Sequence, residues 1–396
     1  MAIDRQKWNR RDAFRLRGAV DRFSRRSPGF DRVGGGAGST DLIVGRRRAM
    51  GSYFEIKLGA NVPGAAGLIE RTLDRVDVLE SRLTVYRDDS ELSMINARAH
   101  LGPTPIEHDV FELLVRAFKI SEETGGAYDV TTGALSVAWG FFRGPRRVPD
   151  DATLADAKAK TGYRHVTLDS ERRTIAFDRR GVSLNLGSIG KGYAIDDAIG
   201  EVRRHWWPTG AIVHGGRSSL FALGSPPGRL GSGWDVSVRN PFDPERPLGV
   251  LRLRNRGLGS SGDEFQRFEV DGRVFGHIID PRTGEPASGP ASVTVIAPTA
   301  TEADALSTAF YLLGVDATEA YIDKHPGVAA VFVAAGTPKS LPKVVAIGLR
   351  GDEYEDDPTA PWLVRGSRQL KKINKQSHQS RVEACDLEGT GSGRSK

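Results

Sequence analysis

The spacing of hydrophobic residues predicts a chain in which strands and helices alternate. Apolar and polar residues alternate over residues 53–58, which is the pattern of a half-buried strand. After Pro63, leucine and valine recur at helical spacing as far as Leu83, and a second helix is expected over 110–123. Further short strands, separated by Gly, Pro and Asp turns, are predicted at 166–168, 174–177, 211–213, 234–238, 248–253 and 293–296.

Two more helices, over 193–204 and 303–313, lie between predicted strands. The chain contains no repeat of fixed period. The pattern therefore predicts an α+β fold, a single domain of mixed β-sheets with packed helices. We place this domain at residues 41–361, between a basic N-terminal tail over 1–40 and a polar basic C-terminal tail over 362–396. The acidic run around Asp352 and Glu353 is expected at its solvated edge.

Composition agrees with a globular domain that carries charged ends. The chain has 396 residues, of which 39% are hydrophobic, enough for a sizeable core. No run approaches the roughly 20 apolar residues of a membrane span. The formal net charge of +6 is concentrated in the two tails, which are expected to be flexible. Because Cys385 is the single cysteine, the chain has no intrachain disulfide and no cysteine-based metal site.

The N-terminal residues can be compared with known export signals, which would direct the protein out of the cytoplasm. Arg10 and Arg11 partly match a twin-arginine export signal, but Arg15 and Arg17 stand where its apolar segment should follow. There is also no lipobox cysteine near the start. We therefore predict a cytoplasmic protein.

The segment 277–284 combines three reactive side chains with a rigid turn. A predicted strand over 273–276 leads into it, and two turn-forming pairs, Asp280-Pro281 and Thr283-Gly284, follow. An ordinary hairpin corner needs Pro and Gly but has no use for His277, Asp280 and Arg282 together. This octet therefore indicates a functional site.

A Gly-rich turn over 185–194 follows an apolar run and opens a helical pattern. Backbone amides and Lys191 there are suited to hold a phosphate. The turn does not match a Walker loop, because Asn185 replaces the first Gly and Gly192 stands where Ser or Thr should follow the Lys. From spacing alone, a phosphate site and a tight strand-to-helix connection remain equal alternatives.

The predicted helix start after Thr299 places Asp304 and Thr308 four residues apart, on one helical face. Such hard oxygen ligands suit Mg²⁺. Two capping boxes also fit this segment, Thr299 with Glu302 and Thr301 with Asp304. Spacing alone favours capping over a metal site.

Taken in order along the chain, these motifs resemble the FAD:protein FMN transferases, the ApbE-like flavin transferases. The resemblance covers about residues 48–336 and rests on the order of several distinctive blocks. The blocks are Met50-Gly51-Ser52, the segment 83–92 with Asn96, the segment 126–133, the turn 185–194, His214-Gly215-Gly216, Ser260-Ser261-Gly262-Asp263, the octet 277–284 and the segment 303–308.

The resemblance implies a Mg²⁺-dependent reaction with FAD as substrate. A Thr or Ser hydroxyl of a partner protein attacks the FAD phosphorus nearest riboflavin, AMP leaves, and FMN stays linked to the partner, expected to be a redox subunit. Asp304 and Thr308 match the side-chain metal ligands of the family, and the backbone carbonyl of Ser188 matches a third. The implied FAD contacts are Met50, Tyr86, Ala127, Tyr128, Asp129, Asn185, Lys191 and Ile278.

His277 is the candidate general base, or the donor that steadies the leaving phosphate, because an imidazole titrates near neutral pH. Asp280 is the second catalytic candidate; it either orients His277 or serves the metal. Three positions depart from the family pattern: Asn185 and Arg217 where Asp is frequent, and Gly190 where Ala is common. These changes bear on FAD affinity more than on the type of reaction.

Two alternatives use the same sequence features. A Mg²⁺-dependent FAD pyrophosphatase would use water as the acceptor at the same site and release FMN and AMP. A flavin-binding module would instead use the basic tails to hold nucleic acid or an anionic membrane surface. The C-terminal tail lacks interleaved aromatic residues, which argues against specific nucleic-acid binding.

Overall fold

A ten-stranded sheet forms the centre of the computed structural model, which describes residues 31–33, 42–59, 62–205, 210–262, 267–336, 342–355 and 363–365. Within it, neighbouring described strands are antiparallel except for β16 and β18, which are parallel. In sheet order the strands are β1 (Asp31–Val33), β2 (Leu42–Ala49), β3 (Ser52–Gly59), β7 (Gly210–Gly215), β8 (Ser219–Gly224), β11 (Arg256–Gly262), β14 (Ser292–Ala297), β15 (Ala329–Val333), β16 (Val344–Ile347) and β18 (Leu363–Arg365).

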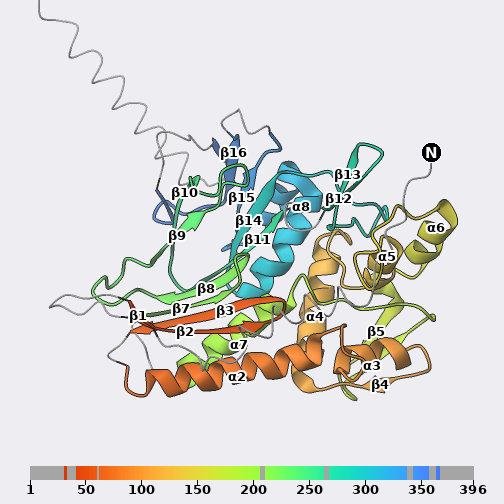
Figure 1. Ribbon diagram of the computed structural model, residues 1–396, viewed down its shortest axis with the longest axis horizontal. Helices are drawn as coiled ribbons and strands as arrows, with labels where there is room; N and C mark the ends of the chain where they lie inside the picture. The colour runs from red at the N-terminus through yellow and green to blue at the C-terminus, as the bar shows by residue number, and fades with distance from the viewer. Residues whose placement is uncertain are drawn as a thin grey trace, which may run out of the picture.

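Helices and a small sheet cover opposite faces of the main sheet. Helices α2 (Ala65–Leu83), α7 (Gly190–His205) and α8 (Ala300–Ile322) pack on one face; in Figure 1, α2 and α7 run below β2, β3 and β7. The small sheet has the order β17 (Tyr354–Glu355), β10 (Gly249–Leu253), β9 (Trp234–Val238). Its buried Trp234 and Leu251 belong to a second apolar cluster, together with Ile212 and Val331 of the main sheet. Both faces of the central strands are therefore buried.

The remaining elements form the right-hand part of Figure 1. They include a three-stranded sheet of order β4-β6-β5 and the hairpin β12–β13. Their bounds are α3 (Glu91–Arg98), β4 (Thr104–Pro105), α4 (His108–Glu123), α5 (Gly133–Ala138), α6 (Asp151–Ala159), η1 (Tyr163–His165), β5 (Val166–Asp169), β6 (Thr174–Phe177), β12 (Arg267–Val270) and β13 (Arg273–Gly276). Trp139 after α5 packs against Phe275 of β13, with ring centroids 5.4 Å apart.

The predicted α+β class, with mixed sheets and packed helices in one domain, is confirmed. Each strand and helix predicted above is present, with its start displaced by at most three residues, and the last helix continues to Ile322 across a kink at Gly314. Several strands were not predicted, among them β8 and β11. β8 is buried on both faces and therefore shows no alternation, and β11 is rich in Gly and Ser, which disfavour strands.

The acidic edge expected around Asp352 and Glu353 is confirmed only in part, and little of the two terminal tails is described. Asp352 is exposed, as expected, but the prediction for Glu353 is wrong: it is 5% exposed and pairs with buried Arg256 at 2.9 Å. Most of the tails lies outside the described residues. β1 and β18, which fall within the ranges 1–40 and 362–396, pair with β2 and β16, so sheet pairing extends past both proposed boundaries.

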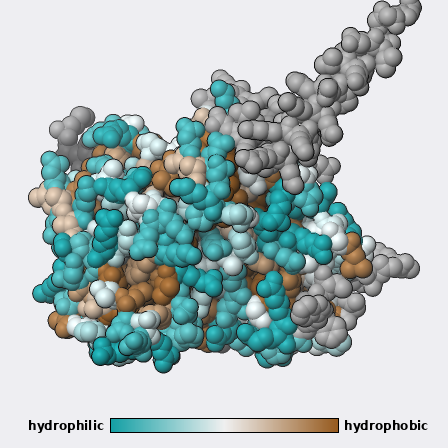
Figure 2. All heavy atoms as spheres, turned by 180° about the vertical axis from the view of Figure 1, so that it is seen from behind, coloured by the Kyte–Doolittle hydropathy of each residue, from teal (hydrophilic) through white to brown (hydrophobic). Residues whose placement is uncertain are grey.

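The back face of the molecule is mainly polar. Figure 2 shows hydrophilic side chains over most of the back face, with small apolar areas between them. Among the described residues, no helix is long and apolar enough to cross a membrane.

The first turns of α7 and α8 cross at very short range. A Cβ atom on Gly192 of α7 would lie 2.3 Å from the carbonyl oxygen of Ala300 in α8, so only glycine fits there. Asp196 of α7 accepts hydrogen bonds from the backbone N–H groups of Ala300 (2.9 Å) and Thr301 (2.8 Å), and from the Thr301 hydroxyl. A carboxylate of α7 thus caps α8 from outside that helix.

We expect Asp196→Ala to destabilise the domain by about 2 kcal/mol, the upper end for a lost helix cap, because three donors lose their acceptor inside the helix crossing. Asp197→Ala is the matched control. Asp197 forms a surface ion pair with Arg75 at 3.0 Å, and its loss should cost less than about 1 kcal/mol. Urea unfolding measures both free energies, and equal effects would contradict the capping role.

Candidate functional site

One cleft collects nearly all the side chains singled out from the sequence. It has a volume of about 900 Å³ and lies where β3, β7, β11 and the first turns of α7 and α8 meet. Twelve of the thirteen predicted site residues line it: Met50, Tyr86, Ala127, Tyr128, Asp129, Asn185, Ser188, Lys191, His277, Ile278, Asp304 and Thr308. Asp280 is the exception.

The Gly-rich turn presents the start of α7 to this cleft. The Asn185 side-chain oxygen accepts from the Gly187 N–H at 3.0 Å, which closes a tight turn after the buried Leu184 and Leu186. Helix α7 then begins at Gly190, and Lys191 donates to the Gly187 carbonyl at 3.3 Å. The turn therefore makes a tight strand-to-helix connection and also places a helix N-terminus and a lysine at the cleft, a combination that attracts phosphate.

Asp304 is a buried carboxylate at the bottom of the cleft. It is 4% exposed, and its two oxygens accept from the Gly192 N–H at 3.0 Å and from the Ser219 hydroxyl at 2.9 Å. Within its own segment α8 is capped by Thr299, whose hydroxyl accepts from the Glu302 N–H at 3.1 Å, in addition to the cap from Asp196 of α7. Asp304 is therefore not needed as a cap of its own helix, and the metal-site interpretation of this segment stays open.

Hydroxyl groups extend this polar floor. Ser261 of β11 lies 2.7 Å from the Ser307 hydroxyl and 3.3 Å from that of Thr308. The predicted ligand set contains only one carboxylate. In agreement, no group of three or more His, Cys, Asp and Glu residues suited to a metal occurs in the described parts of the chain. A cation here would need oxygen atoms from its substrate as well.

Aromatic and buried polar residues form another part of the cleft lining. Tyr128 is 1% exposed, and burial raises the pKa of its phenol well above the ordinary value. Asp129 accepts from the Thr131 N–H and from the Tyr163 N–H, while burial raises the pKa of its carboxyl. Tyr86 is 70% exposed and contacts Phe142 with ring centroids 5.2 Å apart. This part of the lining thus offers a fixed polar interior and an aromatic rim.

His277 and Asp280 have different surroundings although they are three residues apart. His277 follows β13 directly and lines the cleft. The Asp280 carboxylate instead accepts from Arg282, at 2.9 Å from the Nε atom and at 2.7 Å from an Nη atom. Asp280 thus helps to fix the turn after Ile279, and its role in catalysis remains only a prediction.

Several residues in or behind the cleft were not among the predicted site residues. Ser219 does not line the cleft but donates to Asp304 from behind it; it sits in a strand that is buried except for its last residue, so it leaves no pattern in the sequence. Ser261 belongs to a block quoted above but has no evident ligand role until β11 is seen beside α8. His214 also lines the cleft, and burial, followed by the charge of Lys57, lowers its pKa to about 4. His214 is therefore neutral at physiological pH.

The three departures from the family pattern are all at or beside the cleft. Asn185 and Arg217 line it, and Gly190 starts α7. Arg217 adds a positive charge where the resemblance suggests a carboxylate.

Comparison with known proteins agrees with this arrangement. A model of the ApbE family matches residues 50–332. A protein of Treponema pallidum named FAD:protein FMN transferase is 31% identical over 299 residues, which are 72% of this chain and 82% of that protein. The protein of the same name from Escherichia coli K12 is 31% identical over 285 residues, covering 70% and 80% of the two chains.

Solved structures share the fold. The ApbE protein of Thermotoga maritima has a TM-score of 0.67 and 27% identity, covering 77% of this chain and 94% of its own. The apo form of the flavinyl transferase ApbE of Pseudomonas stutzeri has a TM-score of 0.66 and 29% identity, covering 75% and 92%. With the family model matching most of the chain and its predicted site residues gathered in one cleft, the chain belongs to the ApbE family.

Proposed function

We propose that this enzyme transfers the FMN moiety of FAD to a Thr or Ser hydroxyl of a partner protein and releases AMP. Family membership and relatives named FAD:protein FMN transferase support the transferase activity. The observation that carries the assignment to this cleft is the meeting of Asp304 with the helix N-terminus that bears Lys191. A pyrophosphate needs positive potential and fixed geometry, and the cleft offers both.

Asp304, Thr308 and the Ser188 carbonyl are the groups that would hold Mg²⁺. The fit rests on Asp304, a carboxylate that is 4% exposed and whose hydrogen-bond donors among the described residues, the Gly192 N–H and the Ser219 hydroxyl, are both uncharged. A buried carboxylate without a cation is costly, so the site favours one. When bound, Mg²⁺ would neutralise charge on the pyrophosphate and orient it. Lys191 and the start of α7 would act on the same pyrophosphate charge.

His277 is proposed to take the proton from the attacking hydroxyl. It lies at the end of β13, an element fixed by the aromatic contacts of Phe275, and it faces the same cleft as Asp304. Asp280 is the alternative base, but its bonds to Arg282 favour a role in shaping the turn. The transfer breaks the P–O bond to AMP and forms a P–O bond to the acceptor.

The acceptor is proposed to be a redox subunit made in the same cell, and the cytoplasm is the proposed compartment on the sequence argument given above. FAD hydrolysis by water uses the same groups and is the second candidate. Mixing the protein with FAD, Mg²⁺ and candidate subunits, followed by mass spectrometry, distinguishes the two. An FMN addition on a Thr or Ser supports transfer; release of free FMN with every acceptor unmodified supports hydrolysis.

The metal assignment predicts a large effect at Asp304. Asp304→Asn keeps the shape of the side chain and can keep the hydrogen bonds to Gly192 and Ser219, yet removes the charge. We expect a rate at least about 100-fold lower in saturating Mg²⁺, because a bound metal supplies several kcal/mol of transition-state stabilisation. Glu302→Gln, two residues earlier on α8 and engaged with Thr299, is the matched control and should stay active. Full activity of Asp304→Asn would contradict the assignment.

If His277 is the general base, replacing it should slow FMN transfer and leave FAD binding intact. His277→Asn should bind FAD within a few-fold of the unmodified protein but transfer FMN about 10²–10⁴-fold more slowly. The rate of the unmodified protein should fall as the pH decreases through the range in which imidazole protonates. His214, with a pKa of about 4, contributes nothing to that fall. If His277→Asn retains its rate while Asp280→Asn loses it, Asp280 is the base.

A further inference from the structure

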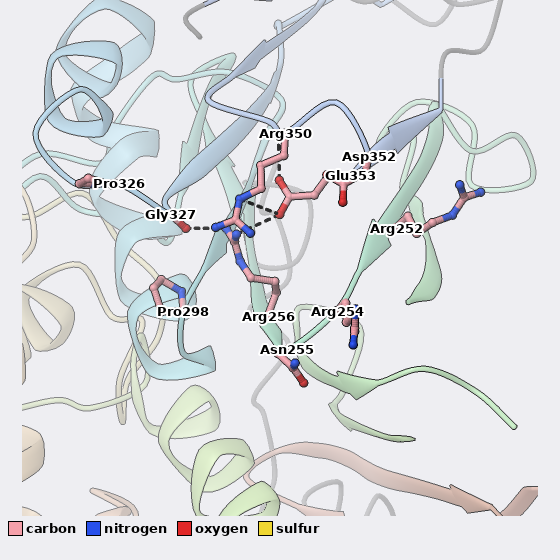
Figure 3. A pocket seen from close by; sticks show the side chains of 10 residues that line it. All are labelled: Arg252, Arg254, Asn255, Arg256, Pro298, Pro326, Gly327, Arg350, Asp352 and Glu353. Atoms are coloured by element: carbon pink, nitrogen blue, oxygen red, sulfur yellow. Dashed lines mark hydrogen bonds and ion pairs between the residues drawn. The ribbon is translucent and has the colours of Figure 1, made fainter. Parts of the chain in front are cut away.

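A second pocket lies at the other end of β11 from the flavin cleft. It has a volume of about 500 Å³ and shares no lining residue with the cleft. Four separate segments form it: the end of β10 with the β10–β11 turn and the first residue of β11, Pro298 two residues before α8, the α8–β15 loop and the β16–β17 loop. The volume is within the range of small-molecule sites. Figure 3 shows Arg256, Arg350 and Glu353 meeting in this pocket, with Arg254 and Asp352 also in its lining.

Two of its arginines share one carboxylate. Arg256 is 5% exposed and donates to Glu353 at 2.9 Å and to the Gly327 carbonyl. The Nε atom of Arg350 is 3.9 Å from the same Glu353 oxygen, and Figure 3 shows the two guanidinium groups next to each other. Burial lowers the pKa of Arg256; Arg350 also lowers it, against the opposite effect of Glu353. The positive charge here is therefore only partly balanced.

Arg254 adds a further positive charge. It lines the pocket, it is exposed, and it forms no ion pair with any other described residue. Arg252 contributes less, because it pairs with Asp235 at 3.1 Å and points away from the others in Figure 3. Arg254, Arg256 and Arg350 thus outnumber the two carboxylates of the lining, Asp352 and Glu353.

We propose that this pocket binds a small molecule through its phosphate group. Arg254 and Arg350 are the direct ligands, and Arg256 supplies fixed charge behind them, since its Nη atoms are already engaged. A carboxylate uses both of its oxygen atoms in a bidentate pair with one guanidinium group. A phosphate has further oxygen atoms and can therefore accept bidentate hydrogen bonds from two guanidinium groups. The remaining volume, beside Pro298 and Pro326, holds the group that carries the phosphate.

The test measures binding of inorganic phosphate to the full chain. Equilibrium dialysis is run with FAD at saturation, so that the flavin cleft is blocked, and again without FAD, so that the result does not depend on the proposed function. Chloride keeps the ionic strength constant. With FAD at saturation we expect saturable binding of one phosphate; in both arms the binding to this pocket should be at least about 10-fold weaker in Arg254→Gln/Arg350→Gln, because two charged hydrogen-bond donors are lost.

Arg71→Gln/Arg98→Gln is the matched control. It removes the same charge from two exposed helical positions outside the pocket and should bind phosphate like the unmodified protein. The ligands of the pocket variant are exposed, so its melting temperature should be unchanged. No saturable binding to the unmodified protein, or equal binding to both double variants, would overturn the proposal.

Binding of AMP and of succinate shows which class of molecule the pocket takes. If the ligand is a nucleotide, AMP binds more tightly than phosphate, and this gain is lost in the pocket variant. If the ligand is free phosphate, AMP binds no better. Succinate tests the competing class: should it bind as tightly as phosphate, the assignment to phosphate is wrong, because a dicarboxylate then satisfies the same arginines.

Discussion

The site depends on the crossing of two helix N-termini, each of which is capped by a carboxylate of the other helix. Asp196 of α7 accepts from the first residues of α8, and Asp304 of α8 accepts from Gly192 in the first turn of α7. The two helices can approach this closely because Gly192 has no side chain at the contact with Ala300. Once both caps form, the Gly-rich turn and Asp304 must lie in the same cleft. The positive N-terminus of α7, which bears Lys191, then lies at the place where a pyrophosphate would bind.

β11 connects this arrangement to the rest of the sheet. A Cβ atom on Gly259 would lie 2.3 Å from the Ala303 carbonyl oxygen, so α8 rests directly on the strand backbone. At one end of β11, Ser261 contacts Thr308 in the cleft; at the other, Arg256 enters the second pocket. Polar groups lie at both ends of β11, but the two sites carry charges of opposite sign. The cleft has a carboxylate, which favours a cation, whereas the second pocket has guanidinium groups, which favour an anion.

Much of this was predictable from the sequence, because the reactive residues stand at the ends of strongly patterned elements. His277 follows a strand, Lys191 opens a helix, and Asp304 and Thr308 share a helical face. Spacing alone left their roles open, and it was the resemblance to the family that assigned them to one site. What the sequence could not give were contacts between distant segments. Nothing local distinguishes Ser219, which holds Asp304, from any buried serine. Glu353 was placed at the surface because its acidic neighbours look solvated, whereas its partner Arg256 is 97 residues away.

The central claim is that the crossing of α7 and α8 builds the metal and pyrophosphate site. The most direct test is a crystal structure with FAD and Mn²⁺ in place of Mg²⁺, in which anomalous scattering locates the ion. The account predicts the ion within about 2–2.5 Å of oxygen atoms of Asp304 and Thr308, with the pyrophosphate against the start of α7. An ion bound elsewhere in the cleft, or a pyrophosphate held away from Lys191, would contradict it.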